Sequence, residues 1–134
     1  KLSLTKEFNL LNKNNVAAEQ SDDNRERTSE VFAYIVDHFR SEVSLNKAAQ
    51  TIGMTPNAFC KYFKKITRKT FMETVIDYRI NFATQQLIET DKSIADICFD
   101  CGFRDISHFY KMFTFRKQIS PSGYRKQFFQ ETNY

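Results

Sequence analysis

Two stretches of this sequence repeat each other, and the repeat limits the possible folds more than any other feature. A serine, a run of apolar residues at helical spacing and a glycine recur at an offset of 49 residues. Beyond the glycine the offset becomes 50, and two phenylalanines flanking a lysine recur. One supersecondary unit is therefore expected twice. The matched pairs are Ser44/Ser93, Leu45/Ile94, Ala48/Ile97, Ala49/Cys98, Ile52/Cys101, Gly53/Gly102, Met54/Phe103, Phe59/Phe109, Lys61/Lys111 and Phe63/Phe113.

Each copy has the signals of a short helix, a tight turn and a longer helix. A capping side chain precedes each helix, and a glycine follows the short one. Apolar residues at three- and four-residue spacing give each helix one buried face. This combination predicts a helix-turn-helix at residues 44–68 and another at 93–118. The signals are Ser44, Gly53, Thr55 and Pro56 in the first copy and Ser93, Gly102 and Asp105 in the second.

The remainder of the chain also favours helices. Only three glycines and two prolines occur among 134 residues, and 41% of the residues are hydrophobic, enough for a core. We therefore predict an all-α fold of about seven helices, with the two helix-turn-helix subdomains joined by a long connecting helix at 70–90. A first helix is expected at 28–40 and a last one at 120–129, while the polar residues 15–28 are expected to form a linker.

The charge of the chain is concentrated in two clusters. The formal net charge is +4, yet residues 55–69 hold five basic residues and no acid, and residues 104–126 hold six basic residues and one acid, Asp105. Two separated basic clusters favour a polyanionic partner. Charge runs can instead be solvated helix faces, and for one cluster alone the two explanations would be equally good.

Cysteine content and hydropathy bear on the compartment. Three cysteines without a secretory signal suit a reducing cytosol better than a disulfide scaffold, so a cytoplasmic location is expected. No apolar run approaches the roughly 18 residues of a membrane span, and we expect no membrane partner. The chain begins at Lys1 rather than Met, so we expect a piece of a longer protein or a processed form. Leu4, Phe8 and Leu11 predict the end of a further helix.

The second copy and the connecting segment carry recognisable motifs. The sequence IADICFDCGFRDISHFYKMF runs from 94 to 113, and ISPSGYR runs from 119 to 125. The connecting segment adds Thr70-Phe71, Tyr78-Arg79 and Ala83. Together these motifs resemble the C-terminal DNA-binding domain of the AraC/XylS family of bacterial transcription regulators.

The resemblance covers about a hundred residues, from Ser29 to Phe129. It implies a double helix-turn-helix domain at 29–130 that binds double-stranded DNA in a sequence-specific transcription regulator, expected to be an activator that contacts RNA polymerase. Residues 1–28 would be the end of an upstream sensing or dimerising domain plus a linker. Any dimerisation would use this upstream domain, which this sequence lacks. No cofactor, metal ion or catalytic residue is implied.

Three positions depart from the family pattern. Cys98 stands where the family usually has alanine, and Arg68 and Gln118 stand where a glycine usually follows each recognition helix. A non-glycine residue at positive φ would cost about 1 kcal/mol at each helix end. We therefore expect slightly different helix ends rather than a different fold.

The resemblance also implies which residues meet DNA. The early residues of the second helix of a helix-turn-helix face base edges, and flanking cations hold phosphates. Lys61 and Lys111 are expected to contact guanine, Asn57 adenine and Ile106 a thymine methyl, with ordinary packing as the alternative for Ile106. The groove-facing candidates are Asn57, Cys60, Lys61, Ile106, Ser107, His108, Tyr110 and Lys111. The phosphate candidates are Thr55, Lys64, Lys65, Arg68, Arg104 and Arg116.

The connecting helix fits this role in length. About 20 residues at 1.5 Å per residue give roughly 30 Å, and successive major-groove segments on one face of DNA lie roughly 34 Å apart. One chain could therefore bind two segments without a dimer. Arg79, within this helix, is expected to form a structural ion pair more readily than a DNA contact.

Other functions fit the sequence less well. Cys98 and Cys101 have the spacing of half a zinc site, but their core-like positions favour buried small side chains. Cys60 as a methyl acceptor has no neighbouring base, and no phosphate loop, carboxylate pair or nucleophile elbow indicates an enzyme. The main alternative is an RNA-binding or protein-interaction helical module.

Overall fold

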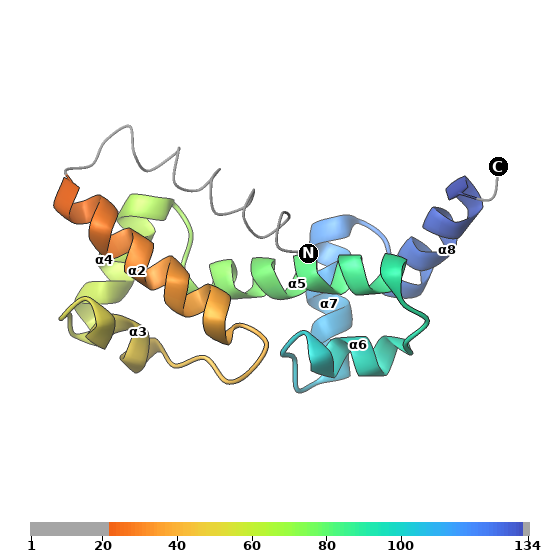
Figure 1. Cartoon of the computed structure of the whole chain (residues 1–134), viewed down its shortest axis with the longest axis horizontal. Coiled ribbons are helices and arrows are strands. Elements are labelled where there is room, and N and C mark those ends of the chain that lie inside the picture. The colour runs from red at the N-terminus through yellow and green to blue at the C-terminus, as the bar shows by residue number, and fades with distance from the viewer. Residues whose placement is uncertain (1–21, 133–134) are drawn as a thin grey trace. The chain divides into compact units, whose positions relative to one another are not determined.

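The computed structural model describes residues 22–132, with side chains from 22 to 128, and these residues form helices without strands (Figure 1). The all-α expectation is confirmed, with seven helices in the described part. They are α2 (Asp22–His38), α3 (Leu45–Thr51), α4 (Pro56–Thr67), α5 (Phe71–Glu89), α6 (Ile94–Asp100), α7 (Ile106–Lys117) and α8 (Pro121–Thr132). The helix expected around Leu4 to Leu11 lies outside the described residues.

The expected start of the first helix was wrong, because α2 begins at Asp22 instead of near Thr28. Asp22 and Asp23 occupy its first turn, where the helix dipole favours negative charge. Arg27 pairs with Asp23 at 3.3 Å, and the Thr28 hydroxyl donates to the Asn24 carbonyl at 2.8 Å. These local polar contacts extend the helix through a segment whose sequence lacks an apolar stripe.

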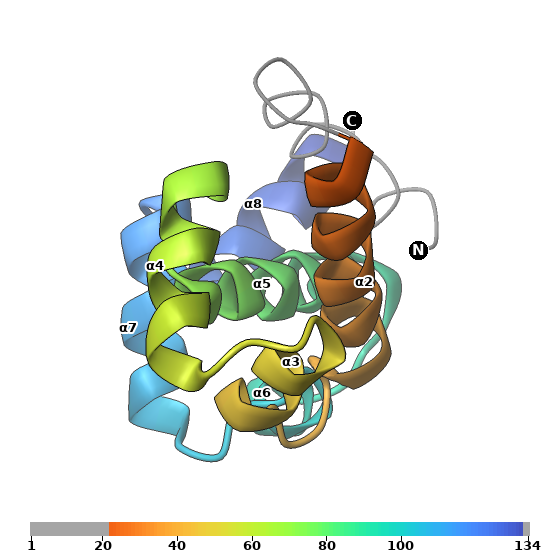
Figure 2. The same cartoon turned by 90° about the vertical axis from the view of Figure 1, so that its left-hand side faces the viewer.

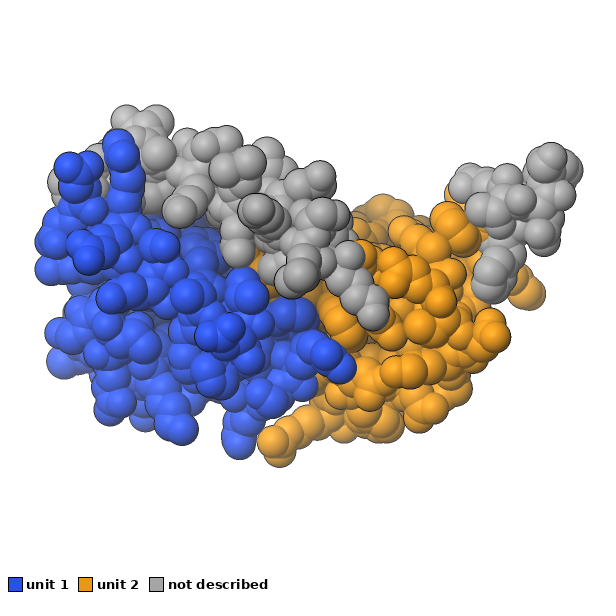
Figure 3. Space-filling view, in the orientation of Figure 1, with its two compact units in different colours: residues 1–75 blue, residues 76–134 orange. Residues whose placement is uncertain are grey.

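The described chain divides into two compact units, residues 22–75 and 76–132 (Figure 3). The first turns of α5 belong to the first unit and the remainder to the second. Each unit thus holds a helix-turn-helix with helical residues before and after it.

The first unit encloses an aromatic core. Figure 2 looks onto α2, α3 and α4, with α5 behind them. Phe59 and Phe63 of α4 meet Phe71 of α5 with ring centroids 5.4 and 5.8 Å apart. Edge-on contacts of this kind add to the free energy gained from burying the rings. Buried residues of α2 and α3 complete the core, namely Val31, Phe32, Ile35, Ala48 and Ala49.

The second unit has a core of the same design. Phe109 and Phe113 of α7 are fully buried, like their counterparts in α4. They pack with Phe103 of the turn and with side chains of α5 and α6. The other buried members are Ile80, Ala83, Leu87, Ile97, Cys98 and Cys101.

The two turns have the same backbone hydrogen bonds. The Met54 N–H donates to the Ala49 carbonyl at 3.0 Å, and the Phe103 N–H donates to the Cys98 carbonyl at 3.1 Å. Gly53 and Gly102 both have positive φ, 67° and 109°, which a residue without Cβ adopts at least cost. The sequence repeat is therefore a structural repeat.

The expectation of altered helix ends was also wrong. Arg68 and Gln118 keep the left-handed conformation, with φ of 69° and 64°, although neither is glycine. Their N–H groups donate to the carbonyls of Lys64 and Thr114, at 2.9 and 2.8 Å. The helix-ending hydrogen bond outweighs the steric cost of a Cβ in this conformation.

Candidate nucleic-acid interface

The helix α4 separates a buried face from an exposed, cationic one. Phe59 and Phe63 face the core, and Tyr62 is half-buried, its hydroxyl 3.3 Å from Asn24 Oδ1 of α2. At the start of the helix the Thr55 hydroxyl accepts the Ala58 N–H at 3.3 Å, which satisfies one otherwise free donor. The sequence-predicted residues of this helix all lie exposed: Asn57, Cys60, Lys61, Lys64, Lys65 and Arg68.

The helix α7 presents an equivalent exposed face. Its N-cap is Asp105, whose carboxylate accepts the Ser107 N–H at 3.0 Å. Tyr110 is half-buried, with its ring against Phe109 at a centroid separation of 6.0 Å. Its side chain is therefore less accessible to a binding partner than those of its exposed neighbours. The remaining predicted residues lie exposed: Arg104, Ile106, Ser107, His108 and Lys111.

Lys61 and Lys111 occupy the same position in the two helices. Each is exposed, and each lies two residues after one buried phenylalanine and two before the next. The structure thus places one cation centrally on the exposed face of the second helix of each helix-turn-helix. A cationic donor there suits the O6 and N7 acceptors of guanine in the major groove.

Comparison with known proteins identifies this arrangement. A family model described as a helix-turn-helix domain matches residues 48–127, more than half of the chain. The chain belongs to the AraC/XylS family of helix-turn-helix DNA-binding domains.

Similar proteins include two curated regulators. The melibiose operon regulatory protein of Escherichia coli K12 is 31% identical over 98 residues, covering 73% of this chain and 32% of that protein. The transcriptional activator RhaS of Klebsiella pneumoniae is 29% identical over 117 residues, covering 87% of this chain and 42% of that protein. The AraC/XylS-type chain therefore spans about a third to two fifths of the length of these relatives.

A solved structure shares the fold. The DNA-binding domain of AdpA, a global transcriptional factor crystallised with a target DNA, superposes with a TM-score of 0.70 at 24% identity. The match covers 75% of this chain and 90% of that one.

One predicted phosphate contact of the AraC/XylS-type domain has a different environment. Arg116 Nε donates to Asp77 Oδ1 at 2.7 Å, and the two side chains are only 19% and 13% exposed. Its Nη1 also lies 3.6 Å from the sulfur of Met112. Arg116 therefore joins α7 to α5 within the second unit, which argues against its assignment to phosphate.

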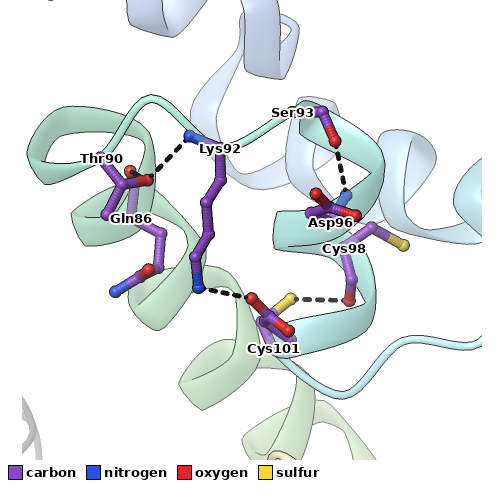
Figure 4. Close-up of polar contacts among 8 residues, drawn as sticks. Gln86, Thr90, Lys92, Ser93, Asp96, Cys98 and Cys101 are labelled. Atoms are coloured by element: carbon purple, nitrogen blue, oxygen red, sulfur yellow. Dashed lines mark hydrogen bonds and ion pairs between the residues drawn. The ribbon is translucent and has the colours of Figure 1, made fainter.

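The Cys98 and Cys101 thiols of the AraC/XylS-type domain are buried, as the sequence predicted. The Cys101 thiol donates to the Cys98 carbonyl at 3.3 Å (Figure 4). Burial raises the pKa of Cys98 to about 11 and that of Cys101 to about 12, which disfavours the thiolate that metal binding and redox chemistry need. Among the described residues no group of three or more His, Cys, Asp or Glu side chains could hold a metal ion.

Arg79 packs against an aromatic ring of its own unit. Its guanidinium carbon lies 5.7 Å from the centroid of the Phe103 ring, a cation–π contact within the second unit. Burial lowers the pKa of Arg79. Arg79 thus has a structural role, because it packs on an aromatic ring next to the turn.

Sequence reasoning did not anticipate what Arg125 does. From α8 its guanidinium donates to the carbonyls of Leu87, Thr90 and Lys92 at 3.0, 3.0 and 2.7 Å. These carbonyls belong to the end of α5 and the turn that follows, where a cation also favours the helix dipole. Figure 4 shows this turn, in which Ser93 then caps α6 through the Asp96 N–H. Only its place in the family motif signalled Arg125.

Phe115 of α7 was also missed. It is 74% exposed, the largest value among the exposed large hydrophobic residues of the described chain. Helical spacing from Lys111 and His108 could have placed it on their face.

Among the described residues, none of the helices is both long and apolar enough to cross a membrane.

Proposed function

We propose that this domain binds double-stranded DNA sequence-specifically, with α4 and α7 each lying in a major groove, as part of a transcription regulator. The observation that carries the proposal is the repeated helix with two buried phenylalanines and one exposed central lysine, Lys61 or Lys111. Packing alone would explain the phenylalanines, but it needs no cation at the same exposed place. Membership of the family and the DNA bound to the similar AdpA domain support the same conclusion.

The exposed residues suggest distinct tasks. We assign base contacts to the exposed faces of both helices, where Lys61 and Lys111 suit guanine and Asn57 suits adenine. Phosphate contacts are assigned to Thr55, Lys64, Lys65, Arg68 and Arg104, which are exposed around these helices.

The connecting helix supports reading of two successive groove segments. The 19 residues of α5 correspond to about 28 Å at 1.5 Å per residue. That length is close to the roughly 34 Å helical repeat of DNA. We propose that one chain engages two segments.

Wider roles belong to the whole regulator. The domain would act in the cytoplasm, where the bacterial genome lies. Activation is the mode that the name of the RhaS relative favours, and we propose that it uses contact with RNA polymerase. Dimerisation would require a region outside the described residues. Catalysis is not part of the proposal, because the relatives are transcription regulators.

Selection of bound sequences from a random duplex library tests the proposal. Two short conserved blocks about one helical turn apart are expected, with affinity that falls as salt rises. Binding without any enriched sequence would overturn sequence-specific reading and favour an RNA-binding or protein-interaction module, which the same assay with RNA competitors would separate.

Substitutions test the assignment of roles. Lys61→Ala or Lys111→Ala should relax base preference at one position, at a cost of about 1 to 3 kcal/mol. Lys64→Ala is the matched control from the same face, and it should weaken binding to all sequences alike. A uniform loss for all three variants would contradict the division into base and phosphate contacts.

A further inference from the structure

The two helix-turn-helix copies differ sharply in charge. Residues 44–72, around α3 and α4, contain six basic residues and no acid, and all six are exposed. The equivalent residues 93–122 contain four basic residues and three acids. One of those four, Arg116, is paired with Asp77. The first copy can therefore neutralise far more phosphate charge than the second.

The helix N-termini differ in the same direction. The N-cap of α4 is Thr55, which carries no charge, whereas the N-cap of α7 is the carboxylate of Asp105. A carboxylate already satisfies the positive end of the α7 dipole and repels a phosphate that approaches it. The second copy is thus less suited to holding the DNA backbone.

An apolar side chain replaces a cation on the exposed face of α7. Phe115 corresponds in the repeat to Lys65, and both are exposed. His108, Lys111 and Phe115 follow one another at three and four residues, so they lie on one face of the helix. Within α4, no large hydrophobic side chain is exposed.

We propose that the two copies divide DNA recognition: α4 supplies most of the phosphate binding, and α7 reads thymine methyl groups through Phe115. The C5-methyl of thymine is the apolar group that a base pair presents in the major groove. An exposed phenyl ring beside Lys111 can bury such a methyl, whereas a phosphate has no apolar surface for the ring to contact. The inference rests on the proposed function and adds to the block of the second copy an A·T pair beside the guanine assigned to Lys111.

Replacing thymine by deoxyuracil tests the methyl contact, because it removes only the C5-methyl. A site is first selected from the random library, and its two blocks are assigned by the loss of preference in Lys61→Ala and Lys111→Ala. Deoxyuracil in the block of the second copy should weaken binding about fourfold per contacted methyl, equivalent to about 0.8 kcal/mol. The same exchange in the other block should have little effect.

Variants of Phe115 connect the methyl effect to this side chain. Phe115→Ala should bind the natural site more weakly and lose the discrimination between thymine and deoxyuracil. Phe99→Ala is the matched control, because it removes another exposed ring of the same unit, from α6, and should keep the discrimination. The effect of replacing thymine by deoxyuracil on the wild-type protein does not depend on the folding of any variant. Thermal melting checks that the variants are folded.

Salt dependence tests the other half of the proposal. Lys64→Gln and Lys65→Gln should each lower the slope of log affinity against log salt by about 1. Phe115→Lys, which restores the residue type of the first copy, should raise the slope by about 1 and abolish the deoxyuracil effect.

Two results would overturn the inference. The first is a deoxyuracil effect that is absent, or that survives in Phe115→Ala. The second is a larger loss of salt slope from Lys111→Gln and Lys117→Gln together than from the α4 pair. Either result leaves specific DNA binding intact, whereas failure of the proposed function would appear earlier, as a library without an enriched site.

Discussion

Removing the ion pair between Arg116 and Asp77 should destabilise the second unit by more than a surface pair would. Two unit charges about 4 Å apart attract by about 4 kcal/mol at an effective dielectric constant of about 20. Desolvation of both groups offsets part of this gain. With side chains 19% and 13% exposed, the pair lies between exposed pairs, worth about 0.2 to 1 kcal/mol, and fully buried ones. We expect a coupling energy of about 2 kcal/mol.

A double-mutant cycle measures this coupling. Arg116→Gln, Asp77→Asn and the double variant would be unfolded in urea, with the transition of the second unit followed separately if the units unfold in two steps. Each single change should cost about 2 kcal/mol, and the double variant should cost less than the sum of the two.

The same variants decide between the two roles of Arg116. DNA binding of Arg116→Gln, measured well below its melting temperature, should keep the salt slope of the parent. A coupling below about 0.5 kcal/mol together with a slope lower by about 1 would refute the structural role and restore the phosphate assignment.

Four further predictions concern other residues. At neutral pH a thiol reagent should modify Cys60 quickly, and Cys98 and Cys101 only on unfolding, because the last two are buried; a count of three fast thiols would contradict this burial. Burial raises the pKa of Cys98 to about 11 and that of Cys101 to about 12, so the free energy of unfolding should be highest below about pH 8.5 and fall as pH rises towards 11. The loss should reach about 1.4 kcal/mol per thiol near pH 10. In urea titrations at pH 8 and 10, Cys98→Ala should show about half of this pH dependence, and an unchanged dependence would argue against the thiols as its cause. Gln118→Gly should raise the free energy of unfolding by about 0.5 to 1 kcal/mol. Glycine removes the steric cost of a positive φ, and the greater freedom of the unfolded chain offsets part of this gain. Gln118→Ala keeps a Cβ and should not raise the free energy of unfolding. Arg125→Gln should lower it by about 2 to 3 kcal/mol through the loss of three carbonyl contacts, and a loss below about 0.5 kcal/mol in chemical unfolding would show that the contacts are dispensable.

The helix pairs were predictable because local signals and packing agree in them. Ser44, Thr55, Ser93 and Asp105 each cap the helix that their sequence position indicated. The exposed cations of α4 were likewise predictable, since helical spacing alone fixes which side faces away from Phe59.

What could not be predicted depends on contacts between segments distant in sequence. Besides its local contacts, the start of α2 has a hydrogen bond from Tyr62 to Asn24, 38 residues away. Charge alone made Arg116 a phosphate candidate, because nothing in the sequence shows that Asp77 lies beside it. The three contacts of Arg125 depend equally on how α8 packs against the end of α5.

The separation of core and contact residues on opposite faces of α4 and α7 has an evolutionary consequence. Both helices have 12 residues between their caps, and both anchor themselves with two phenylalanines on one side. Substitutions on the other side leave this anchoring untouched, so each helix can change what it recognises without loss of folding stability. Duplication makes such changes safer still, because one copy can hold the operator while the other acquires a new preference. A lineage of regulators could diversify its targets in this way one block at a time.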